Sequence, residues 1–293
     1  AVDATLADRV IVAGSANNGG VLLAALSKTD GRLIWSRQVA LTADGSISRA
    51  HALAVDAMGN GYFGGFAGDA STAVLTRVTG LNTDAPAIEW SRTMAIGRGG
   101  NVNSLALDGA GGVVVSLDYR GGTTYFGLAR VSATGALVWG KVFDHMSARA
   151  PNSTSVVAVS GTSVYVGGRM GLSPHDTTSG DGAILRLALA DGAWQWGAFY
   201  YTGTTTTTIS EHRVKAIIPT ASGLLVLAQG FPGMNNENHY SGLWYQTTNE
   251  GTMFPSGTGS MRLANAVTAG MLMVTDRPAV SLAPLLFVQS ATQ

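Results

Sequence analysis

Ionisable and aromatic side chains are concentrated directly after apolar, strand-like runs and inside long Gly-rich or Asn-rich segments. Asp118, Tyr119 and Arg120 follow one apolar run, and Arg169 follows another. Carboxylate, phenol and guanidinium groups held together can bind a polar ligand or a protein partner, or they can pair with one another. The pattern therefore leaves two interpretations open: a solvated rim with ion pairs, and a contact with a ligand or partner.

The first long Gly-rich segment, residues 171–182, contains His175 and Asp176 side by side. Imidazole and carboxylate groups are metal ligands, but the acidic residues of this segment do not follow the fixed spacing of a calcium-binding loop. We therefore keep His175 and Asp176 as candidates for contact with a partner, and we predict no metal site.

The second long segment, residues 230–242, is rich in Asn and leads into an aromatic cluster. Its candidate residues are Asn238, His239, Tyr240, Trp244 and Tyr245. Exposed aromatic rings beside Asn amides suit a carbohydrate, because such rings offer an apolar face and a polar edge. Asn is also common in turns that bind nothing, because its side chain bonds the backbone nearby. Glycan binding and simple turn formation remain alternatives here.

No pattern typical of catalysis is present. The five histidines, His51, His145, His175, His212 and His239, are scattered and form no His-x-x-x-His or Glu-x-x-His pair. The Gly-x-Ser-x-Gly turn of many hydrolases and the phosphate-binding P-loop are also missing. Because the sequence has no Cys, it offers no thiolate metal ligand and no Cys nucleophile. We expect no catalytic residue, no cofactor and no enzyme activity.

The composition limits the partners that can be expected. Lys+Arg and Asp+Glu are balanced at 18 each, so no basic excess points to a nucleic acid. No apolar run reaches the roughly 18 residues that cross a bilayer, so we expect no membrane insertion. Only 12% of the residues are charged, and the loops are rich in Thr, Ser and Asn. This composition favours an extracellular or periplasmic protein, or a virion structural protein of a phage tail or capsid.

The elements that must position these residues form a repeat. A strand-like run, an Asp-Gly or Thr-Gly turn and then Trp recur in residues 26–35, 131–139 and 187–196, and with a longer turn in 78–90. Residues 249–254 are a degenerate copy with Glu-Gly and with Phe at the aromatic position. Before each copy, an apolar strand restarts after a Gly turn with a period of roughly 50 residues, which is typical of four-stranded blades. The restarts lie near Val10, Gly61, Gly112, Val164, Leu224 and Met271.

This repeat, without helical periodicity, predicts an all-β fold: a single β-propeller domain over residues 1–293 with four-stranded blades. We expect six blades, with five or seven as alternatives, and the apolar restart as the innermost strand of each. The N-terminal strand, Ala1 to Leu6, is expected to complete the last blade, beside the strands Met271 to Thr275 and Val280 to Gln289, and so to close the ring with strands from both ends of the chain. An unpaired sheet edge would promote aggregation.

The segment of strand, Asp/Thr-Gly and Trp resembles the repeat of quinoprotein-type (PQQ-type) β-propellers, and about five copies cover most of the chain. The resemblance implies a propeller fold. It also makes a quinone-dependent oxidoreductase one alternative activity, although the adjacent cysteine pair of catalytic members is missing here. No acidic cluster marks the calcium of such a site either.

The sequence thus favours a non-enzymatic structural or interaction module, a propeller scaffold that binds a protein or a glycan and takes part in a larger assembly. The alternative is an exported enzyme, a lyase, hydrolase or quinone-dependent oxidoreductase, with its site at the channel mouth. Short turns dominate one end of each predicted blade, and long loops the other. Because binding is usually placed on long loops of a rigid scaffold, we expect residues 171–182 and 230–242 to contribute most.

Overall fold

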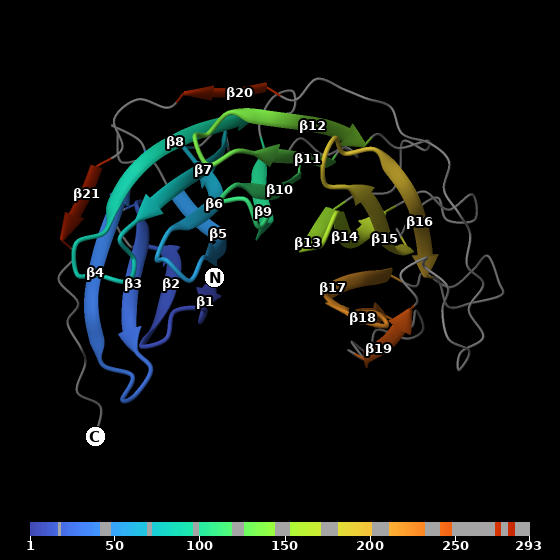
Figure 1. The fold of residues 1–293 in the computed structure, drawn as a ribbon, viewed down its shortest axis with the longest axis horizontal. Coiled ribbons are helices and arrows are strands. Elements are labelled where there is room, and N and C mark those ends of the chain that lie inside the picture. The colour runs from blue at the N-terminus through green and yellow to red at the C-terminus, as the bar shows by residue number, and fades with distance from the viewer. Residues whose placement is uncertain are drawn as a thin grey trace. The chain divides into compact units, whose positions relative to one another are not determined.

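The computed structural model places strands and turns throughout the described part of the chain, and none of its described elements is a helix (Figure 1). The predicted all-β class is therefore confirmed. The described residues are 1–16, 19–41, 48–68, 72–95, 100–118, 126–143, 153–170, 181–200, 211–231, 241–247, 273–276 and 281–284.

The chain divides into two compact units. The first consists of Ala1–Ala95, Gly99–Val102 and Val274–Gln293, and the second of Ile96–Arg98 and Asn103–Met273. Each unit is described by itself below. The expectation of a single domain over residues 1–293 stays a prediction.

The first unit contains two sheets, each of which receives a strand from the end of the chain. One sheet has the order β1-β2-β3-β4-β21 and the other β5-β6-β7-β8-β20. The strands of the first sheet are β1 (Val2–Asp3), β2 (Arg9–Ser15), β3 (Val21–Ser27), β4 (Leu33–Ala40) and β21 (Ser281–Pro284). Those of the second are β5 (Ser48–Val55), β6 (Gly61–Ala67), β7 (Thr72–Thr79), β8 (Ala87–Ala95) and β20 (Met273–Asp276).

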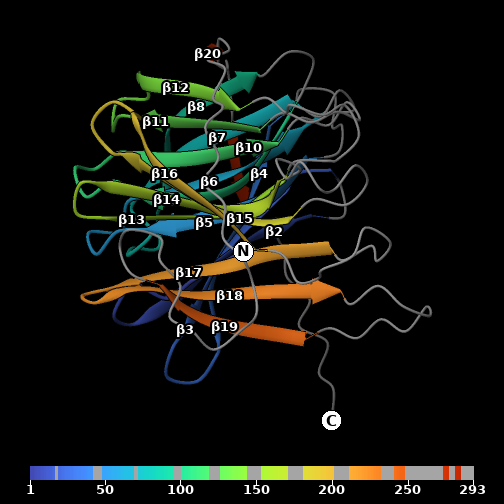
Figure 2. The ribbon, with the colours of Figure 1, turned by 90° about the vertical axis from the view of Figure 1, so that its right-hand side faces the viewer.

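The other three sheets follow in chain order. Their strands belong to the second unit, except for Asn101 and Val102 at the start of β9. One sheet comprises β9 (Asn101–Leu107), β10 (Val113–Asp118), β11 (Phe126–Val131) and β12 (Leu137–Phe143). The next comprises β13 (Ser153–Ser160), β14 (Ser163–Met170), β15 (Asp181–Ala188) and β16 (Trp194–Tyr200). The last comprises β17 (Glu211–Thr220), β18 (Gly223–Phe231) and β19 (Ser241–Thr247) (Figure 2).

Consecutive four-stranded antiparallel sheets are the blades from which β-propellers are built. The predicted blade-type repeat is therefore confirmed by these sheets. The described residues form five sheets. Most of the sixth repeat, beyond Thr247, falls outside the described part, so the count of six blades stays a prediction.

The position of the apolar strand within the sheet differs from the prediction. The apolar restarts form β2, β6, β10, β14 and β18, and each is the second strand of its sheet instead of its first. A repeat fixes the cyclic order of its strands but not the point at which one sheet ends. That point depends on tertiary packing, and the chain starts a new sheet after the connections 41–47, 96–100, 144–152 and 201–210. A second strand is paired on both sides, and Val113 to Leu117 in β10 are completely buried.

The expected pairing partner of the N-terminal strand is also wrong. β1 pairs with β2, through Val2 opposite Val12 and Asp3 opposite Ile11. Strands from both ends of the chain do share one sheet, but the C-terminal contribution is β21 on β4, at the other edge. The short β1 precedes β2 directly in sequence, and a local hairpin forms with less loss of chain entropy than a pairing across the whole chain.

Each tryptophan of the repeat follows a β-bulge in the fourth strand of its sheet. In β4, the register skips Ile34 between Leu33 and Trp35, and the same irregularity recurs in β8, β12 and β16. A bulge adds one unpaired residue and increases the local twist, which re-aims the neighbouring side chains. The bulged residues are Ile34, Glu89, Val138 and Gln195, and the tryptophans that follow, Trp35, Trp90, Trp139 and Trp196, are all buried.

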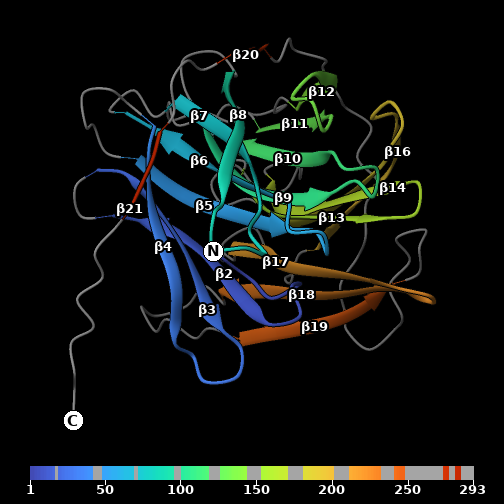
Figure 3. The ribbon, with the colours of Figure 1, turned by 60° about the vertical axis from the view of Figure 1, so that its left-hand side comes forward.

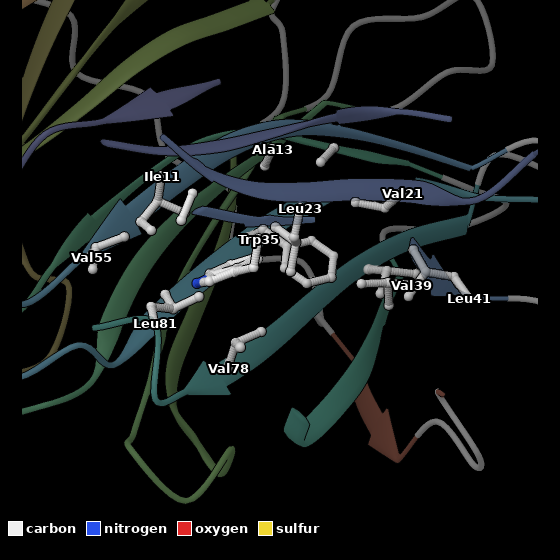
Figure 4. Packing of buried hydrophobic residues seen from close by; sticks show 14 of the residues in the cluster. Ile11, Ala13, Val21, Leu23, Trp35, Val39, Leu41, Val55, Val78 and Leu81 are labelled. Atoms are coloured by element: carbon white, nitrogen blue, oxygen red, sulfur yellow. The ribbon is translucent and has the colours of Figure 1, made fainter. Parts of the chain in front are cut away.

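In the first unit, the tryptophan packs between two sheets. Trp35 of β4 belongs to one apolar cluster with Leu23 and Val39 of its own sheet and with Val78 and Leu81 of the β5–β8 sheet (Figure 4). Its indole Nε1 is buried and has no hydrogen-bond partner among the described residues. Among the described residues, apolar contacts therefore hold this ring, which lies between neighbouring sheets as predicted.

In the second unit, hydrogen bonds from Trp139 and Arg130 to Leu189 join the β9–β12 sheet to the β13–β16 sheet. The Trp139 indole Nε1 donates to the Leu189 carbonyl oxygen at 2.9 Å, and Arg130 Nη1 donates to the same oxygen at 3.3 Å. Arg130 is itself held by Asp108, with Nε and Nη2 each 2.9 Å from Oδ2. The Trp139 ring also covers Gly192, where a Cβ would lie 2.9 Å from Cε3.

Candidate binding site at the strand ends

From β9 to β19, short and long connections alternate along the chain, as predicted, whereas the connections before β9 do not follow this alternation. In the antiparallel sheets, the two-residue connections 161–162 and 221–222 lie at one strand end (Figure 2). The connections 144–152, 171–180 and 201–210 lie at the other end, which we call the long-loop end. Chain reversal in each antiparallel strand pair fixes this arrangement within every sheet.

Two of the predicted site residues have described side chains, and both lie at the long-loop end of the second unit. Asp118 is the last residue of β10, and Arg169 is the next to last of β14. They occupy the same position in neighbouring sheets. Four residues before them, Val114 lies opposite Arg130 and Tyr165 lies opposite Arg186, and both arginines are in the third strand of their sheet. Arg169 is buried and lies opposite Ser153 in register.

The remaining predicted residues cannot be compared with side-chain positions. Trp244 and Tyr245 are in β19, opposite Leu227 and Val226, but only their backbone is described. The others lie outside the described residues: Tyr119, Arg120, His175, Asp176, Asn238, His239 and Tyr240. Their roles in binding stay predictions.

Asp118 connects two sheets. Its Oδ1 accepts hydrogen bonds from the Thr154 backbone nitrogen at 2.9 Å and from Thr154 Oγ1 at 2.8 Å. Asn103 Nδ2 of β9 donates to the Thr154 carbonyl oxygen at 3.2 Å. Three residues further along β13, the Val157 backbone nitrogen donates to Ser104 Oγ at 2.9 Å. Three side chains of β9 and β10 thus hold the first half of β13 through four hydrogen bonds.

Burial raises the pKa of the Asp118 carboxyl from 3.8 to about 6, against the opposing effect of the hydrogen bonds from Thr154 and Asn103 and the charge of Arg213. A carboxyl whose charged form is desolvated is protonated more readily in the folded than in the unfolded chain. At neutral pH, Asp118 is ionised, and its charge is desolvated in the folded chain. The free energy of unfolding is therefore lower than it would be with a protonated carboxyl.

The stability of the chain is expected to depend on pH through Asp118. The stabilising contribution of the raised pKa is complete below pH 3.8 and is lost as the pH rises through about 6. The shift corresponds to about 3 kcal/mol at most. Chemical denaturation of the wild type and of Asp118→Asn over this range isolates the effect, because other titrating groups cancel in the difference. A difference that stays constant between these two pH values would show that the carboxyl is not desolvated.

Sequence reasoning missed Asn103, Thr154 and Arg213, which surround Asp118. All three lie in the first few residues of a strand that begins a new sheet. In the sequence, each of these polar residues stands just before an apolar run. The predicted candidates come only from the ends of the apolar strands, and polar residues at the beginnings of the preceding strands are not among them.

The other described carboxylates have local structural partners. Asp108 accepts hydrogen bonds from the backbone nitrogens of Ala110 and Gly112, both at 2.8 Å, besides its contact with Arg130. Asp56 caps its turn in the same way, and Asp3 accepts from the Val55 backbone nitrogen of the neighbouring sheet at 2.9 Å. These contacts form turns or join sheets, as Asp118 does.

Within the described part of the chain, no group of three His, Cys, Asp or Glu side chains could hold a metal ion. No helix among these residues is long and apolar enough to cross a membrane.

Comparison with known proteins finds a distant likeness at the level of structure and none at the level of sequence. No protein-family model matches the sequence, and no curated protein matches it. Among solved structures, the chain is similar to the quinohemoprotein alcohol dehydrogenase from Comamonas testosteroni, with 14% identity and a TM-score of 0.45. The match covers 91% of this chain and 44% of that one, so this chain spans less than half the length of the dehydrogenase. At this distance, neither a residue role nor an activity carries over.

Proposed function

We propose that this chain is a non-enzymatic scaffold that binds a protein or a glycan through its long-loop end. It would act as a structural or interaction module of a larger assembly, on a cell surface, in the periplasm or in a virus particle. The proposal rests on how the ionisable side chains are used and on where the chain places its long connections.

The observation that supports the proposal most is the structural use of the carboxylates. Asp108 holds Arg130 and its own turn, and Asp118 holds the start of β13. A general acid or base needs a carboxyl that reaches a substrate in a pocket. Carboxyls committed to turns and to neighbouring strands instead stiffen the sheets that carry the loops, which is what a binding scaffold requires.

The connections 171–180 and 232–240 follow β14 and β18, the second strands of two neighbouring sheets. Binding by these connections is part of the proposal. The second connection leads into β19, which contains Trp244 and Tyr245, and aromatic residues of this kind are enriched at the energetic centres of interfaces. A glycan or a protein surface is the chemical class of ligand that such a segment suits.

Shortening both of these connections to Gly-Asn turns is expected to abolish binding and to leave the fold intact, because surface loops change length at small entropic cost. Binding would be measured on a glycan array, and folding by circular dichroism and thermal unfolding. The matched control shortens the equally long connection 201–210, after a fourth strand, and should retain binding. Binding that survives in the doubly shortened variant would contradict the proposed loops.

A separate assay tests the absence of enzyme activity. The chain would be incubated with pyrroloquinoline quinone, calcium and a panel of alcohols, and reduction of an artificial dye would be followed. We expect no dye reduction beyond that of the free quinone with calcium. Substrate-dependent reduction that requires the folded chain would contradict the non-enzymatic proposal and favour the quinone-dependent alternative.

A further inference from the structure

In the first unit, the last strand of each four-stranded meander carries a fifth strand from the end of the chain. β21 pairs antiparallel with β4, with Ser281 opposite Ala40 and Pro284 opposite Arg37 (Figure 3). β20 pairs with β8 of the other sheet (Figure 1). The free edge of a fourth strand in this fold can therefore accept an extended segment.

The bulge before the tryptophan divides each fourth strand into two parts. In β4, the bulge lies at Ile34, and β21 pairs only with the part after Trp35, from Arg37 to Ala40. A bulge interrupts the ladder and twists the edge, which hinders the addition of a strand. The part after the tryptophan is regular and is the part that is used.

The second unit has the same regular edge without a fifth strand. Repeat equivalence places Lys141 in β12 at the position of Arg37, two residues after the tryptophan. Within the part of the chain that the structure describes, no further strand pairs with β12 or β16. On β12, Leu137 and Val138 are 39% and 48% exposed, so apolar surface lies beside the open edge. Such an edge is a template for pairing with another chain.

We propose that the open edge of β12 binds the segment Ser281–Pro284 of a second copy of this chain. That segment is the one that pairs with the equivalent edge of β4, so its backbone fits this kind of strand. Its transfer from β4 of one copy to β12 of another exchanges one four-residue ladder for a similar one. Such strand exchange is a low-cost route to association.

The electrostatics of the chain do not oppose this contact. The formal net charge is zero at pH 7, so two copies do not repel each other through their total charge. The contact is heterologous, because an edge of one copy meets a different segment of the other. This inference concerns assembly, and it does not depend on the loops of the proposed function.

Because the chain has no Cys, introduced thiols report the contact directly. The variant with Lys141→Cys and Pro284→Cys places one thiol on β12 and one on β21. In the proposed contact, these two residues lie directly opposite each other, with Cβ atoms roughly 4.5 to 5.5 Å apart, so a small shift of the strand lets the thiols form a disulfide. Mild oxidation should then give dimers and longer chains on a non-reducing gel, in proportions that rise with protein concentration.

The matched control carries Arg37→Cys with Pro284→Cys, because these residues face each other within one chain. It should oxidise to a closed monomer. Monomers from the Lys141 variant under conditions that close the control would overturn the proposal. Failure of the control to close would also overturn it, since the pairing of β21 with β4 is its premise. Dimers linked through the control pair would show exchange onto β4 of the partner instead of β12, which would equally refute it.

Discussion

Replacement of Arg130 by Met is expected to lower the free energy of unfolding by about 3 to 5 kcal/mol, which is the usual loss when a buried ion pair is broken by removing one partner. The Asp108 side chain is only 2% exposed, and the guanidinium bonds its Oδ2 at 2.9 Å. Met fills a similar volume but leaves the carboxylate without its counter-charge. The same change also removes the bond from Nη1 to the Leu189 carbonyl oxygen of the next sheet. Urea denaturation, followed by circular dichroism, measures the loss.

The control for this variant is Arg32→Met. Arg32 also forms an ion pair, with Asp30, but the two side chains are 76% and 54% exposed and 3.7 Å apart. Exposed pairs of this kind contribute about 0 to 1 kcal/mol, so the control should stay close to wild type. Adding Asp108→Asn to Arg130→Met should recover part of the loss, because no charge is then left buried. Equal effects of Arg130→Met and Arg32→Met would show that the contacts of Arg130 with Asp108 and Leu189 do not stabilise the two sheets.

Replacement of Trp139 by Ala is expected to cost a similar amount, about 3 to 5 kcal/mol, because it removes a large buried ring from a site that cannot collapse. The ring covers Gly192 of the next sheet, and its Nε1 donates to Leu189. Gly192 has a left-handed backbone, with φ of 69°, and has room for no Cβ beneath the ring. The backbone of that turn is thus unable to move into the space that the indole leaves.

Two Phe variants separate the hydrogen bond of the indole from its packing. Trp139→Phe removes the bond to Leu189 and should cost about 1 kcal/mol more than packing alone. Trp35→Phe, in the equivalent position of the first unit, removes no bond, because Trp35 Nε1 has no partner among the described residues. The difference between the two variants in thermal or urea unfolding therefore reports the bond. If Trp35→Phe is as destabilising as Trp139→Phe, the bond contributes nothing to the connection between the sheets.

Strand positions could be predicted because they depend on local patterns. The Gly turns and apolar restarts near Gly61, Gly112 and Val164 become the starts of β6, β10 and β14. The tryptophans are buried as expected, because a large aromatic side chain at a fixed repeat position must lie in the core. The bulge before each tryptophan has no such signal, since Ile34, Glu89, Val138 and Gln195 share no residue type.

The division into sheets and the contacts of Asp118 could not be predicted for a different reason. A period shows which strands repeat, but the end of each sheet depends on tertiary packing, so β10 was expected in the wrong place in its sheet. The partner of Asp118 is Thr154, 36 residues away in the next sheet. No local pattern connects these two residues, and only the packing of β13 against β10 brings them together.

The central claim is that polar side chains at the strand ends, represented by Asp118, join neighbouring sheets. A double-mutant cycle with Asp118→Ala, Thr154→Val and the double variant, measured by urea denaturation above pH 6, tests this claim directly. Thr154→Val removes the hydroxyl that donates to Oδ1, and Asp118→Ala removes the acceptor, so we predict a coupling energy of about 1 to 2 kcal/mol for this one bond. Additive effects of the two substitutions, with no coupling, would contradict the account.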